Sequence, residues 1–368
     1  MPERTIGVGI IGVSPVRGWA ATAHIPALRA LPNYEIRALS AHSADSARAV
    51  GEAFGVSAVF SSYDQLLAQP GIDLVAVTVK APNHRELVTA ALAAGKAVYC
   101  EWPLGSSLDD TRAMAKLATD KGLRTVVGLQ ARQAPAIAFV QALLSDGYVG
   151  EILSTSVLGL SVLGGTLTQA NAYMLARAAG ANALTIAAGH SLDILNYVLG
   201  EFVELSAGLA LRRPLITIEG TGEEIMKTAF DQVMVIGTLS SGATASIHIR
   251  EAVAGGTGFL WEINGTEGTL RITAAAAQPQ IYPLTVAGAR GRNEPAELAI
   301  PTPLIKKWPA LTSLAGAPAF NVGRAYAAFA SDIENGTHTV PDFADALRPH
   351  ELIAAIERSA TSGERVRL

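Results

Sequence analysis

Short apolar runs alternate with segments of helical periodicity through the first 130 residues of the chain. The runs predict strands at residues 5–13, 35–40, 72–79, 98–101 and 124–129. The segments between them predict helices at residues 19–30, 44–54, 84–94 and 107–121. Apolar, β-branched runs of this length are typical of strands buried on both faces. Their alternation with helices predicts βαβ units and a parallel sheet, which is the Rossmann type of α/β fold.

The pattern changes near residue 150. Alternating or β-rich segments predict strands at residues 151–159, 202–212, 230–239, 242–250 and 258–263, with one helix near 181–199. Turn sequences such as Asn264-Gly265 favour antiparallel pairing. Residues 276–310 show little periodicity and are expected to form a long connection, before helices at 321–335 and 343–357. This half therefore predicts an α+β domain built on a large, mostly antiparallel open sheet.

Length and composition limit the classes of protein that fit. A chain of 368 residues is long for one core, so we expect two domains, residues 1–130 and 131–368, with the final helices able to pack back on the first. The net charge of −4 argues against a nucleic-acid partner. The N-terminal apolar run is too short to span a membrane. A single cysteine, Cys100, excludes disulfides and thiolate zinc sites and favours a cytoplasmic location, and the spacing of the other candidate ligands predicts no metal site.

The turn after the first predicted strand has the composition of a nucleotide-binding loop. Gly12 is placed for the tight turn, Ser14 stands where a second glycine is usual, and Gly18 follows one residue later than expected. Such a loop aims a helix N-terminus at a pyrophosphate. The alternative is a glycine-rich turn without a ligand, which the position at the first strand–helix junction disfavours.

Several segments resemble the Gfo/Idh/MocA family of glucose–fructose oxidoreductase and inositol dehydrogenase relatives. They are GIIG (9–12), HIPAL (24–28), APNH (81–84), ALAAGKAVYCEWPL (91–104) and GYVGEI (147–152). Within the family, GWA (18–20), LQARQAP (129–135), GHSLDIL (189–195) and NGTEGTL (264–270) are most similar to the branch of the fungal galactose-regulon repressor. The resemblance implies an NAD(P) domain, and a second domain whose open sheet makes a dimer with one face and lines a substrate cleft with the other.

The resemblance and the loop together give a set of candidate nucleotide-binding residues. They are Gly12, Ser14, Pro15, Arg17, Gly18, Trp19, Ser40, His42, Ser43, Lys80, Pro82, Asn83, His84, Glu101, Trp102, Gln130 and Arg132.

The end of the second predicted strand bears on the choice of nucleotide. NAD-selective Rossmann proteins place an acidic residue there for the ribose 2′-hydroxyl, whereas this chain has Ala41. Ser40, His42 and Ser43 are able to donate to a 2′-phosphate, with Arg17 as a cationic neighbour. NADP is therefore favoured over NAD. Ser43 also has the residue type of a helix N-cap.

The catalytic positions implied by the resemblance are incomplete. Family enzymes usually have Glu-Lys-Pro where this chain has Glu101-Trp102-Pro103, and an indole is neither a useful acid nor a base. A family aspartate four residues before His190 is replaced by Ile186. His190 remains as the candidate acid–base, because imidazole titrates near neutrality. Asp193, on the same helical face, either orients the imidazole or packs the helix.

Other polar residues are candidates for the missing groups. Lys80 and Tyr173 are candidate catalytic residues, and Arg177 is a further possible donor to substrate. His24 is expected to be structural. His248 and Arg250 share one face of a strand, which is either cleft or dimer interface.

Three functions fit these residues. The first is an NAD(P)-dependent oxidoreductase of a sugar, cyclitol or similar small molecule, acting as a homodimer. The second is a cofactor-binding sensor or regulator without turnover. The third is redox-neutral chemistry through transient oxidation, such as glycoside cleavage.

Overall fold

The chain forms two compact units. A computed structural model describes residues 5–161, 166–251 and 256–368. The first unit comprises Met1–Gln130 and Lys306–Arg348, and the second comprises Ala131–Ile305 and Pro349–Leu368. Within the described residues, no helix is both long and apolar enough to cross a lipid bilayer.

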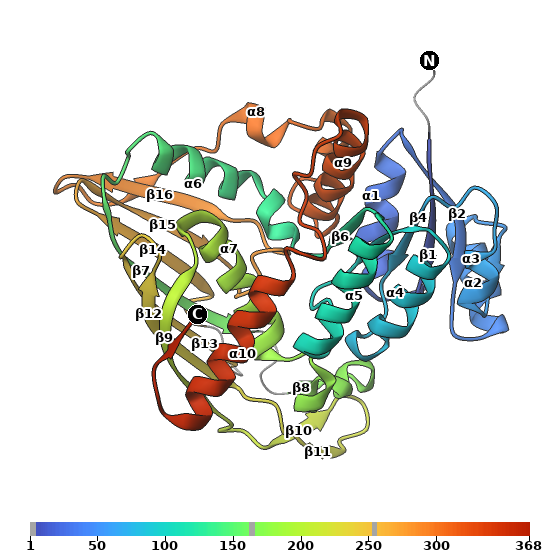
Figure 1. Ribbon diagram of the computed structural model, residues 1–368, viewed down its shortest axis with the longest axis horizontal. Helices are drawn as coiled ribbons and strands as arrows, with labels where there is room; N and C mark the ends of the chain where they lie inside the picture. The colour runs from blue at the N-terminus through green and yellow to red at the C-terminus, as the bar shows by residue number, and fades with distance from the viewer. Residues whose placement is uncertain (1–4, 162–165, 252–255) are drawn as a thin grey trace. The chain divides into compact units, whose positions relative to one another are not determined.

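The first unit is built on a six-stranded sheet in which every pairing is parallel. Its strands are β1 (Ile6–Ile11), β2 (Tyr34–Ser40), β3 (Val59–Phe60), β4 (Leu74–Val77), β5 (Ala97–Cys100) and β6 (Thr125–Val127). The order is β3-β2-β1-β4-β5-β6, and Figure 1 labels β1, β2, β4 and β6 of these. This is the order of a dinucleotide-binding Rossmann fold, and the order reverses between β1 and β4. The predicted parallel Rossmann domain is confirmed.

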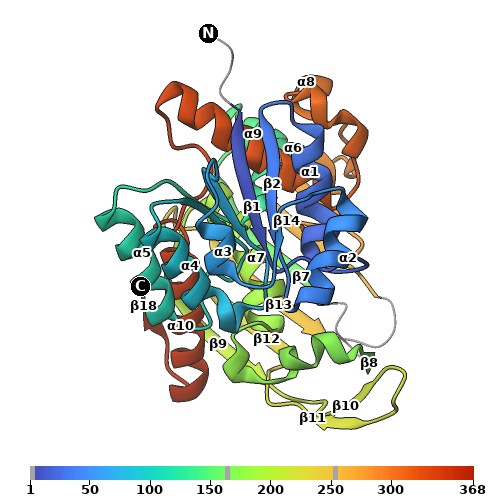
Figure 2. The same cartoon turned by 90° about the vertical axis from the view of Figure 1, so that its right-hand side faces the viewer.

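Helices cover both faces of this sheet. They are η1 (Ala20–His24), α1 (Ile25–Ala30), α2 (Ala44–Phe54), α3 (Tyr63–Leu67), α4 (His84–Ala93), α5 (Leu108–Asp120) and α9 (Ala319–Asn335), with short 3-10 turns at η2 (Ala81–Asn83) and η7 (Pro309–Leu314). Helix α9 packs on η1 and α1, although some 290 residues separate them in sequence (Figures 1 and 2). The four residues of β4 are all buried, as the apolar pattern predicts for a two-sided sheet.

The second unit is built on a nine-stranded sheet. Its order is β17-β16-β15-β14-β7-β13-β12-β9-β18, and the β7–β13 pairing is parallel while the others are antiparallel. The strands are β7 (Ile152–Ser161), β9 (Phe202–Ala210), β12 (Gln232–Leu239), β13 (Thr244–Glu251), β14 (Phe259–Gly265), β15 (Gly268–Ala274), β16 (Thr285–Arg290), β17 (Ala296–Glu297) and β18 (Val366–Arg367). The prediction of a mostly antiparallel open sheet is confirmed.

One face of this sheet is covered and the other is open. The covering helices are α6 (Pro135–Ser145), η6 (Ala183–Ala188), α7 (Gly189–Leu199) and α10 (Leu347–Ser362) (Figure 1). The π-helix η6 packs against β7, β12 and β13. Alternate residues of β12 are buried (Val233, Val235) and exposed (Met234, Ile236). The strands therefore have the period-two pattern of a sheet with one covered face.

A smaller sheet lies beside the long one in the same unit. It has the order β11-β10-β8, with β8 (Thr166–Leu167), β10 (Leu215–Ile218) and β11 (Glu224–Met226). Leu167, Leu175, Ile216 and Ile218 form its own apolar cluster. Leu175 ends the 3-10 helix η4 (Gln169–Leu175), which precedes η5 (Arg177–Ala179).

Several elements were not predicted, among them α3, β10, β11 and β15, and three further differences follow. Residues 276–310 contain β16, β17 and the short helix α8 (Thr302–Ile305), so the expectation of an irregular connection was wrong there. Residues 135–145 form α6, for which no element was predicted. Segment 19–30 begins as a π-helix and becomes an α-helix only at Ile25.

Candidate nucleotide-binding site and predicted catalytic residues

The loop after β1 is held close to the neighbouring strands. The backbone N–H groups of Gly12 and Val13 both donate to the carbonyl of Ser40, at 3.0 and 3.1 Å. Gly12 has φ +97°, and a Cβ there would lie 2.5 Å from Cγ1 of Val79. Only glycine fits such a left-handed position against another chain segment. Gly12 therefore makes the tight turn that the sequence predicts, at the strand where the sheet order reverses.

The far end of this loop has the donors and the space that a phosphate group needs. Gly18 has φ +94°, and nothing lies within 4 Å of where its Cβ would be. Arg17 is exposed, and the buried indole Nε1 of Trp19 has no hydrogen-bond partner among the described residues. Helix η1 begins at the next residue, so its N-terminus belongs to the same loop, and the N–H of Thr22 there donates to the carbonyl of Gly18 at 3.1 Å. Together with Ser14 and Pro15, these residues fit a dinucleotide pyrophosphate.

The residues after β2 divide into capping and exposed positions. Ser43 is the N-cap of α2, and its Oγ accepts from the backbone N–H of Ser46 at 3.2 Å. Ser40 is buried, Ala41 occupies the position of the usual acidic residue, and His42 is exposed. The capping interpretation of Ser43 is thus correct, and His42 is the most accessible of the three predicted donors.

The segment after β4 places its polar residues in two environments. Lys80, Pro82 and Asn83 are exposed. His84 is buried, with Nδ1 3.0 Å from the carbonyl of Pro103 and Nε2 3.0 Å from that of Val79. Burial lowers the pKa of His84, while the carbonyls act in the opposite direction. His84 therefore lies between the loops after β4 and β5, and the ring nitrogen that carries the hydrogen donates to the carbonyl facing it.

Glu101, directly after β5, sits in a buried polar cluster. Its Oε1 is 2.8 Å from Nε2 of His24, and its Oε2 accepts from Nε2 of Gln130 at 3.2 Å. Nδ1 of His24 is in turn 2.7 Å from the hydroxyl of Tyr326 on α9. Trp102 beside it is 6% exposed. The Glu-Trp-Pro triplet thus contributes a carboxylate that is held by the ring of His24.

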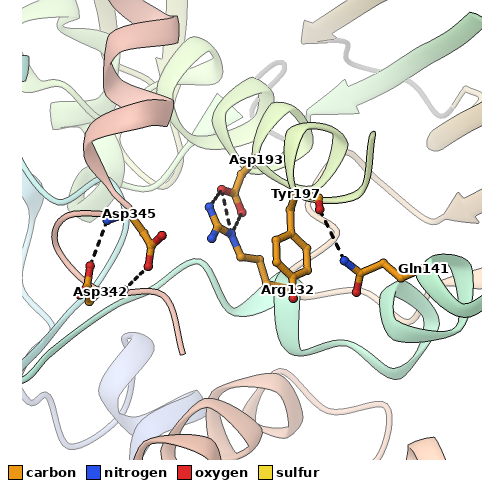
Figure 3. Close-up of polar contacts among 6 residues, drawn as sticks. All are labelled: Arg132, Gln141, Asp193, Tyr197, Asp342 and Asp345. Atoms are coloured by element: carbon orange, nitrogen blue, oxygen red, sulfur yellow. Dashed lines mark hydrogen bonds and ion pairs between the residues drawn. The ribbon is translucent and has the colours of Figure 1, made fainter. Parts of the chain in front are cut away.

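A second buried carboxylate, Asp193 on α7, is held by an arginine. Nη2 of Arg132 donates to its Oδ1 at 2.7 Å, and Nε donates to the same carboxylate at 3.1 Å (Figure 3). The guanidinium also lies 5.0 Å from the ring centroid of Tyr197, whose carbonyl accepts from Gln141 at 3.4 Å. Arg132 was predicted to bind the nucleotide, and Asp193 either to orient His190 or to pack its helix. The structure assigns each of them the other as a partner.

Figure 3 also draws Asp342 and Asp345 of the first unit. The N–H of Asp342 donates to the side chain of Asp345 at 2.9 Å, and the N–H of Asp345 donates to the side chain of Asp342 at 3.0 Å. These reciprocal hydrogen bonds satisfy two backbone N–H groups in the turn before α10.

His190 lies in the first turn of α7 and is 4% exposed. The helix is preceded by η6, which begins with a capping box: Asn182 Oδ1 accepts from the N–H of Leu184 at 3.0 Å, and Thr185 Oγ1 accepts from the N–H of Asn182 at 2.9 Å. Because η6 is a π-helix, the angle around the helix axis between Ile186 and His190 differs from that in a regular α-helix. Such turns are frequent at functional sites.

The remaining candidates are in the 3-10 helices η4 and η5 of the second unit. Tyr173, in η4, is partly buried, and burial raises the pKa of its hydroxyl. Arg177 is engaged: it pairs with Glu357 at 2.8 Å and lies 4.9 Å from the ring centroid of Phe230. Across residues 5–161, 166–251 and 256–368, no three His, Cys, Asp or Glu side chains gather as a metal ion would need.

Tyr326 is a site residue that the sequence pattern did not single out, and His24 is one that it assigned a structural role. His24 was expected to be structural, and it is fully buried, but its ring contacts the carboxylate of a predicted nucleotide-binding residue. Its place in the HIPAL segment was the available signal. Tyr326 had none, because it is 302 residues from His24 in sequence.

Fold and loop define a class: an NAD-binding Rossmann domain joined to an α+β domain with an open sheet. Two family descriptions match these parts, "Oxidoreductase family, NAD-binding Rossmann fold" over residues 6–129 and "Gal80p, C-terminal domain" over residues 135–274. The chain belongs to the Gfo/Idh/MocA oxidoreductase family, near its Gal80 branch.

Named relatives include both enzymes and a regulator. A dehydrogenase of Aspergillus oryzae is 27% identical over 98% of each chain. The galactose/lactose metabolism regulatory protein of Saccharomyces cerevisiae is 26% identical over 79% of this chain and 72% of its own length. Levoglucosan dehydrogenase of Pseudarthrobacter phenanthrenivorans is 26% identical over 73% of each. The crystal structure of a super-repressor mutant of Gal80p from Saccharomyces cerevisiae has a TM-score of 0.88 and 23% identity, covering 99% of this chain and 98% of that one, which shows the shared fold.

Proposed function

We propose that this protein is an NAD(P)-dependent oxidoreductase that transfers hydride between the nicotinamide and a sugar, cyclitol or similar hydroxylated small molecule. One observation carries the proposal: the Gly12 turn and the open loop to Gly18 lie at the reversal point of a Rossmann sheet. Relatives named as dehydrogenases of levoglucosan and D-apiose support the substrate class.

The nicotinamide supplies the hydride chemistry, so the protein must bind, orient and move one proton. Trp102 occupies the position where family enzymes have lysine, and its N–H has no useful basicity. We propose His190 as the acid–base group, with Tyr173 and Lys80 as further donors. Since the carboxylate of Asp193 is held by Arg132, the pair supports α7 rather than taking the proton.

For the nucleotide, we propose NADP over NAD. Ala41 offers no carboxylate to a ribose 2′-hydroxyl, whereas His42 and Arg17 are exposed. Titration with NADH and NADPH, followed by nicotinamide fluorescence, tests this choice. Tighter binding of NADPH that is lost in Arg17→Ala supports it, and equal affinity for both nucleotides contradicts it.

The open face of the nine-stranded sheet is the surface for a second copy of this chain. Leu158, Val203, Met234 and Ile236 are exposed large apolar residues on its strands, and His248 pairs with Met234 in register. Apolar side chains on one sheet face mark an interface more often than an ordinary solvated surface. A homodimer that dissociates in Ile236→Asp supports this surface. A wild-type monomer at micromolar concentration contradicts it.

A non-catalytic NAD(P)-binding regulator is the alternative function. The observation that favours it is Trp102 at the lysine position, together with the regulatory relative. Such a protein needs the nucleotide-binding loop but no proton donor, so binding without turnover would identify it.

Turnover assays separate the two functions. Purified protein is mixed with NADP or NAD and a panel of sugars, anhydrosugars and inositols, and absorbance at 340 nm is followed. We expect turnover with at least one compound, and a loss of roughly 10²- to 10⁴-fold in kcat/KM in His190→Asn. The control is His338→Asn, since His338 is exposed in the first unit. Nucleotide binding with no turnover across the panel would support the regulator, and no binding of either nucleotide would refute both.

A further inference from the structure

The Glu101 carboxylate is joined to two fully buried side chains that have no part in the proposal above. His24 and Tyr326 are both 0% exposed, and each is hydrogen-bonded to the next: Tyr326 Oη to His24 Nδ1 at 2.7 Å, and His24 Nε2 to Glu101 Oε1 at 2.8 Å. The Glu101 side chain itself is 15% exposed. This series of hydrogen bonds therefore runs from the core of the first unit to a carboxylate that solvent reaches.

The direction of these hydrogen bonds follows from the chemistry of the three groups. An ionised carboxylate only accepts, so Nε2 of His24 carries a hydrogen toward Glu101. Burial raises the pKa of Tyr326 well above its ordinary value, so its hydroxyl keeps its proton. In a neutral imidazole Nδ1 then accepts from Tyr326. Tyr326 thus fixes the tautomer, and His24 fixes one oxygen of Glu101.

The other side of the carboxylate is equally restricted. Gln130 donates to Oε2, and a Cβ at Gly128 would lie 2.6 Å from the same oxygen. Only glycine leaves room for the carboxylate in this orientation. The amide oxygen of Gln130, itself 1% exposed, has no hydrogen-bond partner among the described residues. A buried acceptor beside a held carboxylate is completed by a ligand that brings hydroxyl or N–H donors.

The position of Glu101 indicates which ligand group brings those donors. Glu101 follows β5, on the β4-β5-β6 side of the sheet reversal. In this strand order each half of the sheet serves one mononucleotide, and ligands bind at the carboxyl ends of the strands. The glycine turn follows β1, and His42 follows β2 in the other half. Glu101 therefore lies in the half that serves the nicotinamide nucleotide, whose ribose carries two hydroxyl donors.

We propose that Tyr326 and His24 are positioning residues that hold the Glu101 carboxylate, together with Gln130, as the acceptor for the ribose hydroxyls of the nicotinamide nucleotide. This inference rests on the nucleotide binding in the proposed function. It assigns His24 and Tyr326 a task in affinity for the nucleotide, and it requires no proton transfer through them.

Two isosteric replacements of His24 separate its two hydrogen bonds. A glutamine amide nitrogen reaches the place of Nε2, so His24→Gln keeps the donor to Glu101 and loses the contact with Tyr326. An asparagine reaches only the place of Nδ1, so His24→Asn keeps the Tyr326 side and loses the Glu101 side. We expect His24→Asn to raise the Kd of the nucleotide about 10- to 30-fold, because a hydrogen bond to a charged group is lost, and His24→Gln to raise it less than about 3-fold.

Tyr326→Phe and Tyr34→Phe form a matched pair. Tyr34 is also buried, its ring centroid lies 5.4 Å from that of Tyr326, and its hydroxyl donates to the Tyr326 carbonyl at 2.8 Å. Each variant loses one buried hydroxyl, but only Tyr326→Phe frees Nδ1 of His24. We expect Tyr326→Phe to raise the nucleotide Kd about 2- to 5-fold, and Tyr34→Phe to lower thermal stability without changing the Kd.

The measurements are the nucleotide Kd by titration, the melting temperature, and the ¹⁵N shifts of the histidine rings in the protein without nucleotide. The shifts should show Nε2 of His24 protonated and Nδ1 accepting. Equal Kd values for wild type, His24→Asn and Tyr326→Phe, with lowered melting temperatures, would contradict the proposal. The hydrogen bonds of Tyr326 and His24 would then serve stability alone. Failure of the wild type itself to bind either nucleotide would instead overturn the proposed function.

Discussion

Each of the two units holds a carboxylate with side-chain donors, but the two are held in different ways. Asp193 in the second unit is clamped by the fork of Arg132, a permanent cation with a fixed planar geometry. Glu101 in the first unit is held by a histidine ring and an amide, and 15% of its side chain stays exposed. The Asp193 side chain is 1% exposed.

This difference indicates different tasks. An ion pair whose carboxylate is fully buried contributes rigidity, and removing one partner is costly. A carboxylate held by weaker donors and still reachable from solvent retains lone pairs for a ligand. We therefore propose that the pairing with Arg132 stabilises α7 and that the Glu101 carboxylate is the one that binds the nucleotide. The following changes test this distinction.

Asp193→Asn should have the largest effect on stability. It removes the buried carboxylate that accepts from Nε and Nη2 of Arg132, and we expect the free energy of unfolding to fall by about 3–5 kcal/mol. Urea denaturation followed by tryptophan fluorescence measures the change.

The matched control for this change is an exposed ion pair. Arg85 and Asp110 are 2.7 Å apart with side chains 60% and 22% exposed, so Asp110→Asn should cost less than about 1 kcal/mol. The Arg132→Met, Asp193→Leu double variant should recover most of the stability, since an apolar pair of similar volume needs no compensation. If Asp193→Asn is as mild as Asp110→Asn, the two buried carboxylates do not differ in the way argued.

Gly12→Ala comes next, because it strains the loop of the first unit. The left-handed φ and the contact with Val79 together should cost about 2 kcal/mol and weaken nucleotide binding. Gly18→Ala is the control: its φ is also positive, but the Cβ enters open space, so we expect about 1 kcal/mol. Calorimetric melting and nucleotide titration measure both. Equal stability losses would mean that the contact with Val79 relaxes at no cost.

The same two units show how far local pattern predicts a structure. Helix α2 was predicted at its observed bounds, because Ser43 caps its start and Gly55 ends it in the left-handed conformation. Strand β16 was missed, because Thr-Val-Ala-Gly-Ala-Arg has weak strand propensity and depends on pairing with β15. Periodicity reports burial within one element and carries no signal for a partner strand.

The site shows the same limit at the level of side chains. The Gly12 turn follows from local sequence, because only glycine adopts its backbone conformation. The pairs Arg132–Asp193 and His24–Glu101 join residues 61 and 77 positions apart, and the fold alone brings them together. For Asp193 the local pattern therefore offered only contact with His190, its neighbour along the helix, or a packing role, while its guanidinium partner lay outside any local pattern.

Ser43→Ala should have a smaller effect on stability. It also tests whether Ser43 of the first unit contacts the nucleotide. Losing an N-cap costs about 1 kcal/mol, and Ser107→Ala removes the equivalent cap of α5, whose Oγ accepts from Asp110 N at 3.1 Å. Both variants should lower stability alike in thermal denaturation. If Ser43 also contacts a 2′-phosphate, Ser43→Ala alone will weaken NADPH relative to NADH, and an unchanged ratio will restrict Ser43 to capping.

His248 on the open sheet face of the second unit should give the smallest effect, as a pH dependence. Burial, and then the charge of Arg250, lower the pKa of His248 below its ordinary value, so the folded chain binds its proton less readily than the unfolded chain does. The contribution of neutral His248 to stability is fully present above the pKa of the unfolded chain, near 6.5. It is lost as the pH falls through the lower pKa of the folded chain. Because the ring is largely solvated, the change should stay below about 1 kcal/mol. Melting temperatures of wild type and His248→Gln between pH 8 and pH 5 should converge at the acid end, since the glutamine has no proton to gain.

If the second copy of the chain covers this face, the homodimer should also dissociate more readily at pH 5 in the wild type than in the variant. Identical dissociation in both would place His248 outside the interface.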